Sequence, residues 1–226
     1  MIELFHVYKR YPGGADTLVD VNLNIPKGSF VFLTGPSGAG KTTLLRLLFK
    51  AEEPTSGQIL INGTNLGRLT PSSVPYLRRN IGVVFQDFRL IPYRNVFENV
   101  ALSLEVLGTP PDVIRRRVDD ILRKVGLHHK AWQLPPTLSG GEQQRVALAR
   151  SIVTDPVILL ADEPTGNLDP AMTLEIMELL KDFNRRGATI LVATHDRSLI
   201  KRLGYRTLNL ERGRLREEGS PLLQGV

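Results

Sequence analysis

Two hydrophobic patterns alternate along this chain. Short, almost uninterrupted apolar runs of strand length end on polar residues, and amphipathic segments of helix length lie between them. The clearest apolar runs are SFVFLTG (29–35), IGVVFQ (81–86), PVILLADE (156–163) and ATILVATHD (188–196). Continuous apolar strands separated by helices are typical of a parallel sheet that helices cover on both faces. The polar ends of such strands gather at one carboxyl edge, where open α/β sheets bind ligands.

The strand pattern disappears over roughly residues 88–138. NVFENVALSLEVL (95–107) and PDVIRRRVDDILRKVGL (111–127) predict helices, with Thr109-Pro110 as the cap and first turn of the second. We therefore expect a helical subdomain inserted into the sheet domain. Earlier in the chain, PTSGQILINGTNLGRL (54–69) predicts short antiparallel strands joined by an Asn-Gly turn.

Composition narrows the class of protein. The chain has 226 residues, of which 42% are hydrophobic, enough for one substantial domain or a core with a subdomain. It has no cysteine, which excludes disulfides and thiolate metal sites and is consistent with a reducing compartment. No apolar run approaches the roughly 18–20 residues that span a bilayer, and the N-terminus lacks the apolar segment of a signal peptide. We expect the protein to be made and kept in the cytosol.

The positive charge is spread along the chain. The net charge is +6, from 29 basic and 23 acidic residues. Arginines cluster only in short groups at 78–79, 115–117, 185–186 and 202–216. Solvated helix faces explain these groups better than nucleic acid or anionic lipid does, because few aromatic residues accompany the arginines. No nucleic-acid partner is expected.

The segment GPSGAGKT (35–42) has the full P-loop pattern, after a predicted strand and before a predicted helix. Its glycines let backbone N–H groups curl around phosphate oxygens, the lysine reaches the outer phosphates, and the threonine hydroxyl ligates Mg²⁺. The residues expected to hold the nucleotide here are Gly35, Pro36, Ser37, Gly38, Ala39, Gly40, Lys41, Thr42 and Thr43.

Two carboxylates, Asp162 and Glu163, end the run VILLADE. Delivering adjacent charges from a buried strand is costly unless they have a use. Successive strand residues point to opposite sides, so the two are expected to have different roles. Asp162 suits the Mg²⁺ shell, and Glu163 suits polarising the attacking water. The alternative is a carboxylate that only caps the following turn.

His195 and Gln86 end two other apolar runs. Beside the P-loop and the carboxylates, His195 is expected to keep the γ-phosphate, the water and the base in register. The amide of Gln86 can join the Mg²⁺ and water shell and also report on whatever touches the next loop. A satisfied polar residue at a strand end is the alternative for each.

Two further residues, Tyr11 and Asp169, can each have either a structural role or a role in nucleotide binding. Tyr11 lies about two dozen residues before the P-loop and is a candidate to stack on adenine, with Tyr8 as a rival. Asp169, in Asn-Leu-Asp-Pro, predicts an N-cap with Pro170 in the first helical turn. It can also contact nucleotide across an interface.

The segment LSGGEQ (138–143) precedes the helical run VALARSIV and resembles a second anion-binding helix start. One P-loop already accounts for one nucleotide. Two copies arranged head to tail would let Ser139, Gly140, Gly141 and Glu142 of each close over the γ-phosphate held by the other. A merely structural N-capped helix explains Ser139 but not two adjacent glycines.

The set of Tyr11, GPSGAGKT, Gln86, LSGGEQ, VILLADE, NLD and His195, in this order, resembles the ATP-binding cassette ATPases over nearly the whole chain. The resemblance implies an α/β fold with a P-loop NTPase core of RecA-like type, an N-terminal antiparallel β subdomain and an inserted helical subdomain. It implies ATP and Mg²⁺ as cofactors and a homodimer around two ATP molecules. The implied bounds are a nucleotide-binding domain over 1–222, with its core in 1–87 and 155–222 and the helical subdomain with the signature motif in 88–154, and a tail over 223–226.

ADEPTGNLD resembles the branch of this family that transmits force, which includes the lipoprotein-release and macrolide-efflux ATPases. VPYLRRNIGVVFQDFRLIPYRNVFENVAL (74–102) resembles the cell-division branch more closely. That resemblance implies a peripheral subunit at the cytoplasmic face of the bacterial inner membrane. Its integral membrane partner would control peptidoglycan hydrolases. The apolar residues after Gln86 either face this partner or pack inside the helical subdomain. They are Phe88, Leu90, Ile91 and Pro92.

Other cassette proteins differ from this sequence in specific ways. DNA-repair members place a long coiled coil between the P-loop and LSGG, whereas about one hundred residues without sustained heptads separate them here. Ribosome-acting members usually join two cassettes in one chain. Solute-importer ATPases often add a regulatory domain after the histidine, and little sequence follows His195 here.

Overall fold

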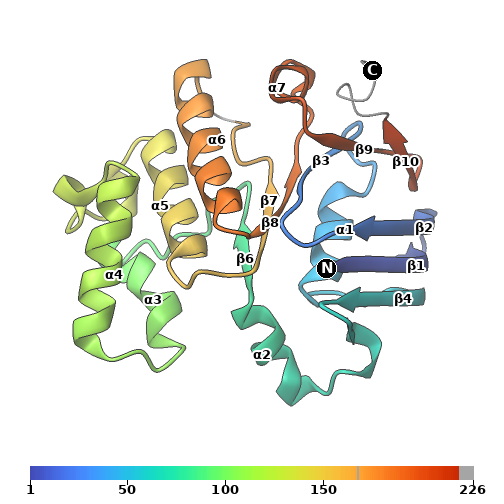
Figure 1. Cartoon of the computed structure of the whole chain (residues 1–226), viewed down its shortest axis with the longest axis horizontal. Helices are drawn as coiled ribbons and strands as arrows, with labels where there is room; N and C mark the ends of the chain where they lie inside the picture. Colours follow the sequence, from blue (N-terminus) through green and yellow to red (C-terminus); the bar gives the residue numbers. More distant parts are fainter. Residues whose placement is uncertain (167, 219–226) are drawn as a thin grey trace.

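The computed structural model describes residues 1–166 and 168–218 and contains two sheets with helices packed around them (Figure 1). Asn167 of the NLD segment and the expected tail 223–226 lie outside the described residues. The larger sheet has the strand order β10-β9-β3-β8-β7-β6. Its strands are β3 (Phe30–Thr34), β6 (Ile81–Val84), β7 (Ile158–Asp162), β8 (Thr189–Ala193), β9 (Arg206–Glu211) and β10 (Arg214–Glu218).

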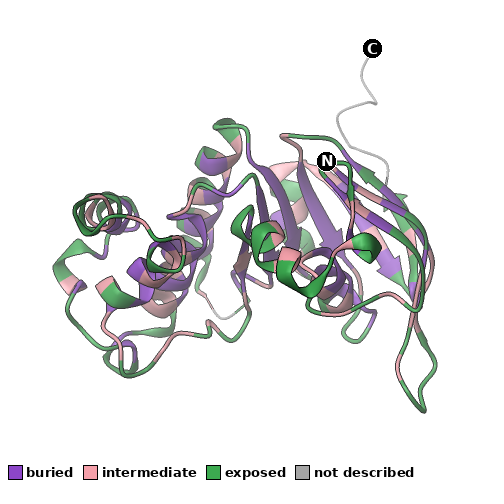
Figure 2. Ribbon diagram, turned by 90° about the horizontal axis from the view of Figure 1, so that it is seen from below, coloured by how far each residue is buried: buried purple, intermediate pink, exposed green. Residues whose placement is uncertain are grey.

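The larger sheet is parallel from β9 to β6, and only β10 runs antiparallel to its neighbour. Both of its faces are buried, because alternate residues of each central strand enter different cores. In β7, Leu159 and Ala161 pack against one set of helices, while Ile158 and Leu160 pack toward the second sheet and α1. Figure 2 shows these central strands as the buried interior of the molecule. The predicted α/β class with a covered parallel sheet is confirmed.

The smaller sheet is antiparallel, in the order β2-β1-β4-β5. Its strands are β1 (Ile2–Arg10), β2 (Asp16–Ile25), β4 (Ser56–Ile61) and β5 (Thr64–Asn65). Asn62 and Gly63 join β4 to β5 with φ of 49° and 77°, the left-handed pair that a tight Asn-Gly hairpin requires. The predicted hairpin is therefore confirmed.

Seven α-helices and four short 3₁₀ turns occur in the described ranges. The helices are α1 (Lys41–Leu48), α2 (Val74–Arg79), α3 (Val96–Glu105), α4 (Pro111–Lys124), α5 (Gly140–Ile152), α6 (Pro170–Arg185) and α7 (Arg197–Leu203). The 3₁₀ turns are η1 (Leu66–Arg68), η2 (Pro71–Ser73), η3 (His128–Lys130) and η4 (Pro135–Thr137). No helix in the part of the chain described here is long and apolar enough to cross a membrane.

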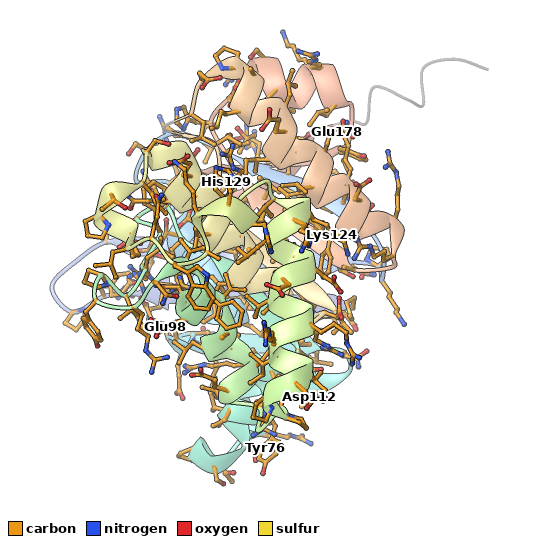
Figure 3. All side chains as sticks on the ribbon, turned by 90° about the vertical axis from the view of Figure 1, so that its left-hand side faces the viewer. Tyr76, Glu98, Asp112, Lys124, His129 and Glu178 are labelled. Carbon is orange, nitrogen blue, oxygen red and sulfur yellow. The ribbon has the colours of Figure 1, made fainter. Side chains whose placement is uncertain are left out.

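Helices α3, α4 and α5 pack on one another beside the larger sheet and form the inserted helical region. Val100 of α3, Leu122 of α4 and Val146 of α5 are fully buried in one core. Figure 3 shows the outer face of α4 lined with charged side chains, with Asp112 and Lys124 labelled near its ends. The predicted pair of helices is confirmed in this region.

One detail of that prediction is wrong. Pro110, not Thr109, is the N-cap of α4, and Pro111 is its first residue. Pro110 is extended, with φ of −59° and ψ of 143°. A residue that precedes a proline is pushed out of the helical region, so Pro111 keeps Pro110 outside the helix.

Candidate functional site

The phosphate loop runs from the end of β3 to the start of α1, and its backbone requires glycine. Gly35 has φ of 147°, and a Cβ there would lie 2.1 Å from the carbonyl oxygen of Leu210. Gly40 has φ of 104° and is the N-cap of α1, with no side-chain cap on the helix. The first N–H groups of α1 are therefore available to an anion. Within the loop, Pro36, Ser37 and Gly38 are exposed and Ala39 is buried.

Lys41, the first residue of α1, is only 9% exposed. Its ammonium group donates hydrogen bonds to the carbonyl oxygens of Gly35 (2.8 Å) and Pro36 (3.2 Å). The carbonyl groups of the loop thus keep the Lys41 ammonium group at the loop. A phosphate oxygen bound there would compete with these carbonyls for the N–H donors of Lys41.

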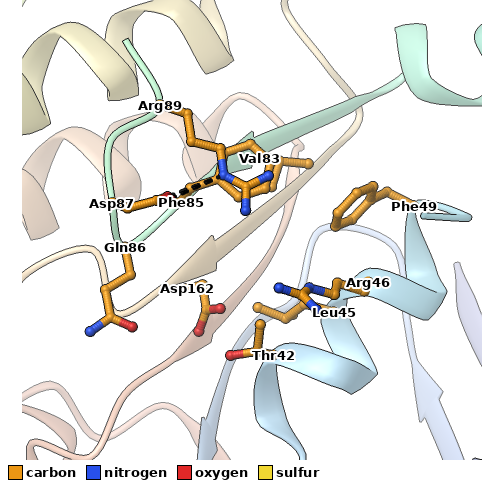
Figure 4. Close-up of a pocket in the computed structure, with 10 residues that line it drawn as sticks. All are labelled: Thr42, Leu45, Arg46, Phe49, Val83, Phe85, Gln86, Asp87, Arg89 and Asp162. Atoms are coloured by element: carbon orange, nitrogen blue, oxygen red, sulfur yellow. Dashed lines mark hydrogen bonds and ion pairs between the residues drawn. The ribbon is translucent and has the colours of Figure 1, made fainter. Parts of the chain in front are cut away.

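Asp162, Thr42 and Gln86 line one cavity of about 410 Å³. Figure 4 shows their polar ends coming together from β7, α1 and the segment after β6. Burial raises the pKa of the Asp162 carboxyl group, and the charge of Glu163 adds to this, while a hydrogen bond from Thr42 opposes it. A hydroxyl, a carboxylate and an amide oxygen are the donor set that Mg²⁺ takes beside nucleotide phosphates, so these residues suit that ion.

Glu163 lies just beyond the end of β7, in a left-handed turn with φ of 47°. Its N–H donates to the carbonyl of Ala193 at 2.9 Å, which fixes the turn against β8. The expectation that the strand pleat separates Asp162 from Glu163 is therefore wrong. The strand stops at Asp162, and the turn sends Glu163 toward His195 instead.

His195 Nδ1 lies 2.9 Å from Glu163 Oε1. The other oxygen, Glu163 Oε2, is buried and has no hydrogen-bond partner among the described residues. The His195 side chain is 70% exposed, whereas that of Glu163 is 10% exposed. A buried carboxylate oriented through one oxygen, with the other free to accept a proton, has the geometry of a general base.

Ser139 caps α5 in a reciprocal capping box with Glu142. The Glu142 N–H donates to Ser139 Oγ at 3.3 Å, and the Ser139 N–H donates to Glu142 Oε2 at 2.9 Å. Lys130 donates to Glu142 Oε1 at 2.6 Å, and this bond is the largest cause of the lowered pKa of Glu142. Both oxygens of Glu142 are thus engaged within its own subunit.

The two glycines of LSGGEQ (138–143), here called the signature segment, differ in their surroundings. A Cβ on Gly141 would lie 2.6 Å from Met172 Sδ, so close packing against α6 accounts for that glycine. A Cβ on Gly140 would meet no described atom within 4 Å. The argument that a structural helix start cannot explain the glycines therefore applies to Gly140 alone.

The phosphate loop and the signature segment do not meet within one subunit. Figure 1 places α1 and α5 on opposite sides of β7 and β8. None of the residues lining the Asp162 cavity comes from the signature segment. The described residues thus bring Thr42, Gln86 and Asp162 to one cavity and pair Glu163 with His195 in a second pocket, and the signature segment lines neither.

Tyr11 is tied to the phosphate-loop helix. Its hydroxyl donates to Glu52 Oε2 at 2.5 Å and lies 3.3 Å from the hydroxyl of Thr43. The Lys9 ammonium group lies 4.9 Å from the centre of its ring. Burial raises the pKa of Tyr11, and the bond to Glu52 adds to this. Tyr8 instead lies within β1, paired with Ser56 of β4.

Asp169 caps α6 as predicted, accepting from the N–H groups of Ala171 and Met172 at 3.0 Å each. After Gln86, Leu90 packs against the core that contains Val100, Leu122 and Val146, and Ile91 lines an open groove. The sequence reasoning had left these two positions undecided between the core and a partner.

Sequence reasoning missed two residues, Glu52 and Arg150. Glu52 sits in an ordinary charged turn, and Arg150 lies inside the helical run VALARSIV. Their importance comes from contacts with segments 41 and about 60 residues away, at Tyr11 and at Phe88 and Arg89. No local pattern in the sequence signals contacts of that separation.

Comparison with known proteins adds an independent line of evidence. A family model described as ABC transporter matches residues 18–166. The chain is 50% identical to the cell division ATP-binding protein FtsE of Bacillus subtilis (strain 168), over 94% of this chain and 93% of that protein. It is 52% identical to FtsE of Mycobacterium tuberculosis (strain ATCC 25618 / H37Rv), over 95% of this chain and 94% of that protein. For FtsE of Escherichia coli (strain K12), the identity is 51%, over 95% and 97% respectively.

Solved structures are similar over the full length. One is the dimeric post-hydrolysis state of the ATP-binding cassette MJ0796 bound to ADP and Pi, with a TM-score of 0.91, 39% identity and complete coverage of both chains. A second dimeric structure of MJ0796, a bacterial ABC transporter cassette, has the same TM-score at 40% identity.

Proposed function

Because this chain belongs to the ABC transporter family and is an ATPase of that family, we propose that it is the ATP-hydrolysing subunit of a bacterial cell-division complex. Its integral membrane partner is of FtsX type, and the subunit lies at the cytoplasmic face of the inner membrane. Conformational change in the cassette passes to that partner and regulates peptidoglycan hydrolysis. The identity of 50–52% over nearly the full length of the FtsE relatives carries this proposal.

The nucleotide occupies the phosphate loop, with its base on Tyr11. The phosphates take hydrogen bonds from the loop N–H groups and from Lys41, which gives up its contacts with the loop carbonyls. Thr42, Asp162 and Gln86 would hold Mg²⁺, and the bound ion would supply neutralisation of charge on the phosphates. A bound cation would favour the charged form of Asp162, against the effect of burial on its pKa.

Glu163 receives the proton of the attacking water on its free oxygen, Oε2. The turn at its backbone and the contact of Oε1 with His195 hold the carboxylate in place for this role. His195, being largely exposed at the edge of the sheet, also reaches the γ-phosphate side of the site.

The second half of each site comes from a second copy of the chain. Gly140 is open to solvent in the single subunit, and the α5 N-terminus offers a helix dipole beside it. In a head-to-tail homodimer, Ser139 and Gly140 of one copy approach the triphosphate of the other, with Asp169 near the same interface. The two MJ0796 structures, which are similar to this chain, are both dimeric.

The membrane partner binds in a groove of about 720 Å³ bordered by α2, β6, α3 and α5, here called the coupling groove. Its lining includes apolar side chains, among them Phe85, Ile91 and Val106. It also has four arginines and no carboxylate among its lining residues, namely Arg78, Arg79, Arg89 and Arg150. An apolar partner segment with at least one carboxylate would complement this lining.

The test is affinity capture of a Glu163→Gln variant from membranes with ATP, followed by identification of the protein that co-purifies. We expect an FtsX-type membrane protein. Recovery of a lipoprotein-release or macrolide-efflux permease instead would replace the cell-division assignment, and recovery of no membrane protein would contradict it.

A matched pair of variants assigns the binding surface. Val106, 70% exposed in the coupling groove, changed to Glu should abolish capture and leave the ATPase activity of the isolated protein intact. The control, Val157→Glu, alters an apolar side chain 38% exposed outside the groove and should leave capture unchanged.

A further inference from the structure

Arg150 joins the last turn of α5 to the loop that follows Gln86. Its guanidinium group donates to the carbonyl oxygen of Arg89 at 2.6 Å through Nη1 and to that of Phe88 at 2.8 Å through Nη2. Its own carbonyl accepts a hydrogen bond from Ser103 Oγ of α3 at 3.1 Å. One side chain of α5, which starts within the signature segment and is here called the signature helix, thus holds two consecutive carbonyls of the loop.

This arginine is half-buried at the wall of the coupling groove. Burial lowers its pKa, and no carboxylate in the described ranges forms an ion pair with it. Partial burial of a charge is costly unless hydrogen bonds replace the water it loses, and here the two loop carbonyls do so. The contact is therefore one that both the helix and the loop depend on.

The loop takes an unusual shape where Arg150 holds it. Phe88 and Arg89 have φ of 57° and 51°, two successive non-glycine residues in the left-handed region. This region is unfavourable for such residues, so surrounding contacts must maintain it. The two hydrogen bonds from the Arg150 guanidinium group to the carbonyls of Phe88 and Arg89 are such contacts.

The rest of the loop is fastened to the helical region as well. Asn99 of α3 is completely buried and accepts from the Ile91 N–H at 2.8 Å. Its amide donates to the carbonyls of Ile91 at 3.0 Å and Arg94 at 2.7 Å. From residue 88 onward the loop is hydrogen-bonded to α3 and α5, and only Asp87 lies between this part of the loop and Gln86.

We propose that Arg150 is a positioning residue that makes Gln86 follow the movement of the signature helix. Helix α5 carries Ser139 at one end and Arg150 at the other, so a shift of the helix at the ATP interface moves the carbonyls of residues 88 and 89. That movement reaches the metal side of the ATP cavity through one intervening residue. The inference rests on the role proposed above for Gln86.

The test is a double-mutant cycle on ATP hydrolysis by the purified full-length protein. Gln86→Ala, Arg150→Ala and the double variant are compared for kcat, for the Mg²⁺ concentration that gives half-maximal activity, and for ATP affinity. We expect each single variant to lower kcat by on the order of tenfold, the range of a charge-assisted hydrogen bond, and to raise the Mg²⁺ requirement. The double variant should be no worse than either, with ATP affinity within about twofold throughout.

Arg150→Lys keeps the charge but loses the fork that binds two carbonyls, so it should show a smaller loss of kcat with the same rise in Mg²⁺ requirement. It also serves if Arg150→Ala does not fold. The matched control is Arg145→Ala on the same helix, whose guanidinium contacts Met172 and Glu175 of α6 instead of the loop. Its effect should add to that of Gln86→Ala.

The outcomes separate the two ideas. If Gln86→Ala leaves kcat and the Mg²⁺ requirement unchanged, the role of Gln86 fails. If Gln86→Ala has its effect but that of Arg150→Ala or Arg150→Lys adds to it fully, as for Arg145→Ala, Arg150 is structural only and the inference fails.

Discussion

Adjacent residues at the end of β7 have different environments, and this difference explains how one dipeptide can serve two tasks. Asp162 ends the strand and shares a cavity with Thr42 and Gln86, whereas Glu163 turns away and is oriented by His195. The sequence predicted two different roles from the strand pleat, whereas the left-handed turn at Glu163 is what separates the two side chains. The roles themselves stay predictions. A turn with positive φ at a glutamate has no sequence signal, because the residue types that usually mark it are Gly, Asn and Asp.

Replacing Glu163 by Gln should slow hydrolysis by roughly 10²–10⁴-fold, the usual contribution of a general base, while ATP still binds. The amide keeps the size of the side chain but cannot take up the proton of water at the position of Oε2. ATP turnover and gel filtration with ATP check this, and we expect dimers to accumulate. Unimpaired turnover would remove Glu163 from the chemistry, and monomers alone would count against ATP-driven pairing.

Glu52 is expected to fix the ring of Tyr11 for the base. The carboxylate lies between the Tyr11 hydroxyl and Arg46, and its pKa is lowered by these hydrogen bonds and by Lys9, although burial acts in the opposite direction. Glu52→Ala should raise the KM for ATP severalfold with little change in kcat, because it loosens binding and not chemistry.

Two tyrosine variants separate tethering from stacking. Tyr11→Phe keeps the ring and loses the tether, so it should resemble Glu52→Ala, whereas Tyr11→Ala should raise KM further. Tyr8→Ala, at a residue without contact to Thr43 among those described, serves as the control. A larger effect at Tyr8 than at Tyr11 would transfer the base contact to Tyr8.

At the scale of elements, the sequence predicted what neighbouring residues determine. The strand runs, the Asn-Gly hairpin, the N-cap at Ser139 and the Asp169 cap all follow from residues within a few positions of one another. The hold of Arg150 on the loop after Gln86, and that of Glu52 on Tyr11, were not predictable in the same way. They depend on which elements the tertiary fold brings together, and arginine and glutamate occur in many solvated helices and turns.

The start of α5 should respond to acid through Glu142. Its folded-state pKa lies below the ordinary value of 4.5, so its contribution to stability is complete above about pH 4.5 and is lost as the pH falls through the lower folded value. Glu142→Gln should therefore lower the free energy of unfolding by about 1 kcal/mol at pH 7, with a smaller difference from the original protein as acid is added.

Urea unfolding between pH 7 and pH 3 measures this difference. Lys130→Met, which removes the cation that contributes most to the shift, should reproduce part of the effect. A difference between Glu142→Gln and the original protein that stays constant over this range would mean that the charge of Glu142 does not stabilise the cap.

At the scale of the whole molecule, the phosphate loop with Glu163 and the signature segment are two halves that one subunit does not bring together. Gly140 has no described neighbour that requires a glycine, whereas Gly141 does. A glycine that no contact within the subunit requires, placed at a helix N-terminus, is explained most simply by a triphosphate held on a second copy.

Mixing two inactive variants tests this arrangement directly. Glu163→Gln removes the base from a chain with a normal signature segment, and Ser139→Arg blocks the signature segment of a chain with a normal base. If the sites form between copies, the mixed dimer contains one site with both normal halves. About half of the dimers are then mixed, each with one of two sites intact, so an equimolar mixture should recover about a quarter of the original ATPase activity.

The controls have no intact site in any dimer. Each variant alone should stay near background. So should a mixture of either single variant with a chain that carries both Glu163→Gln and Ser139→Arg. A mixture with no recovered activity, although both variants bind ATP and form mixed dimers, would mean that each active site belongs to a single chain.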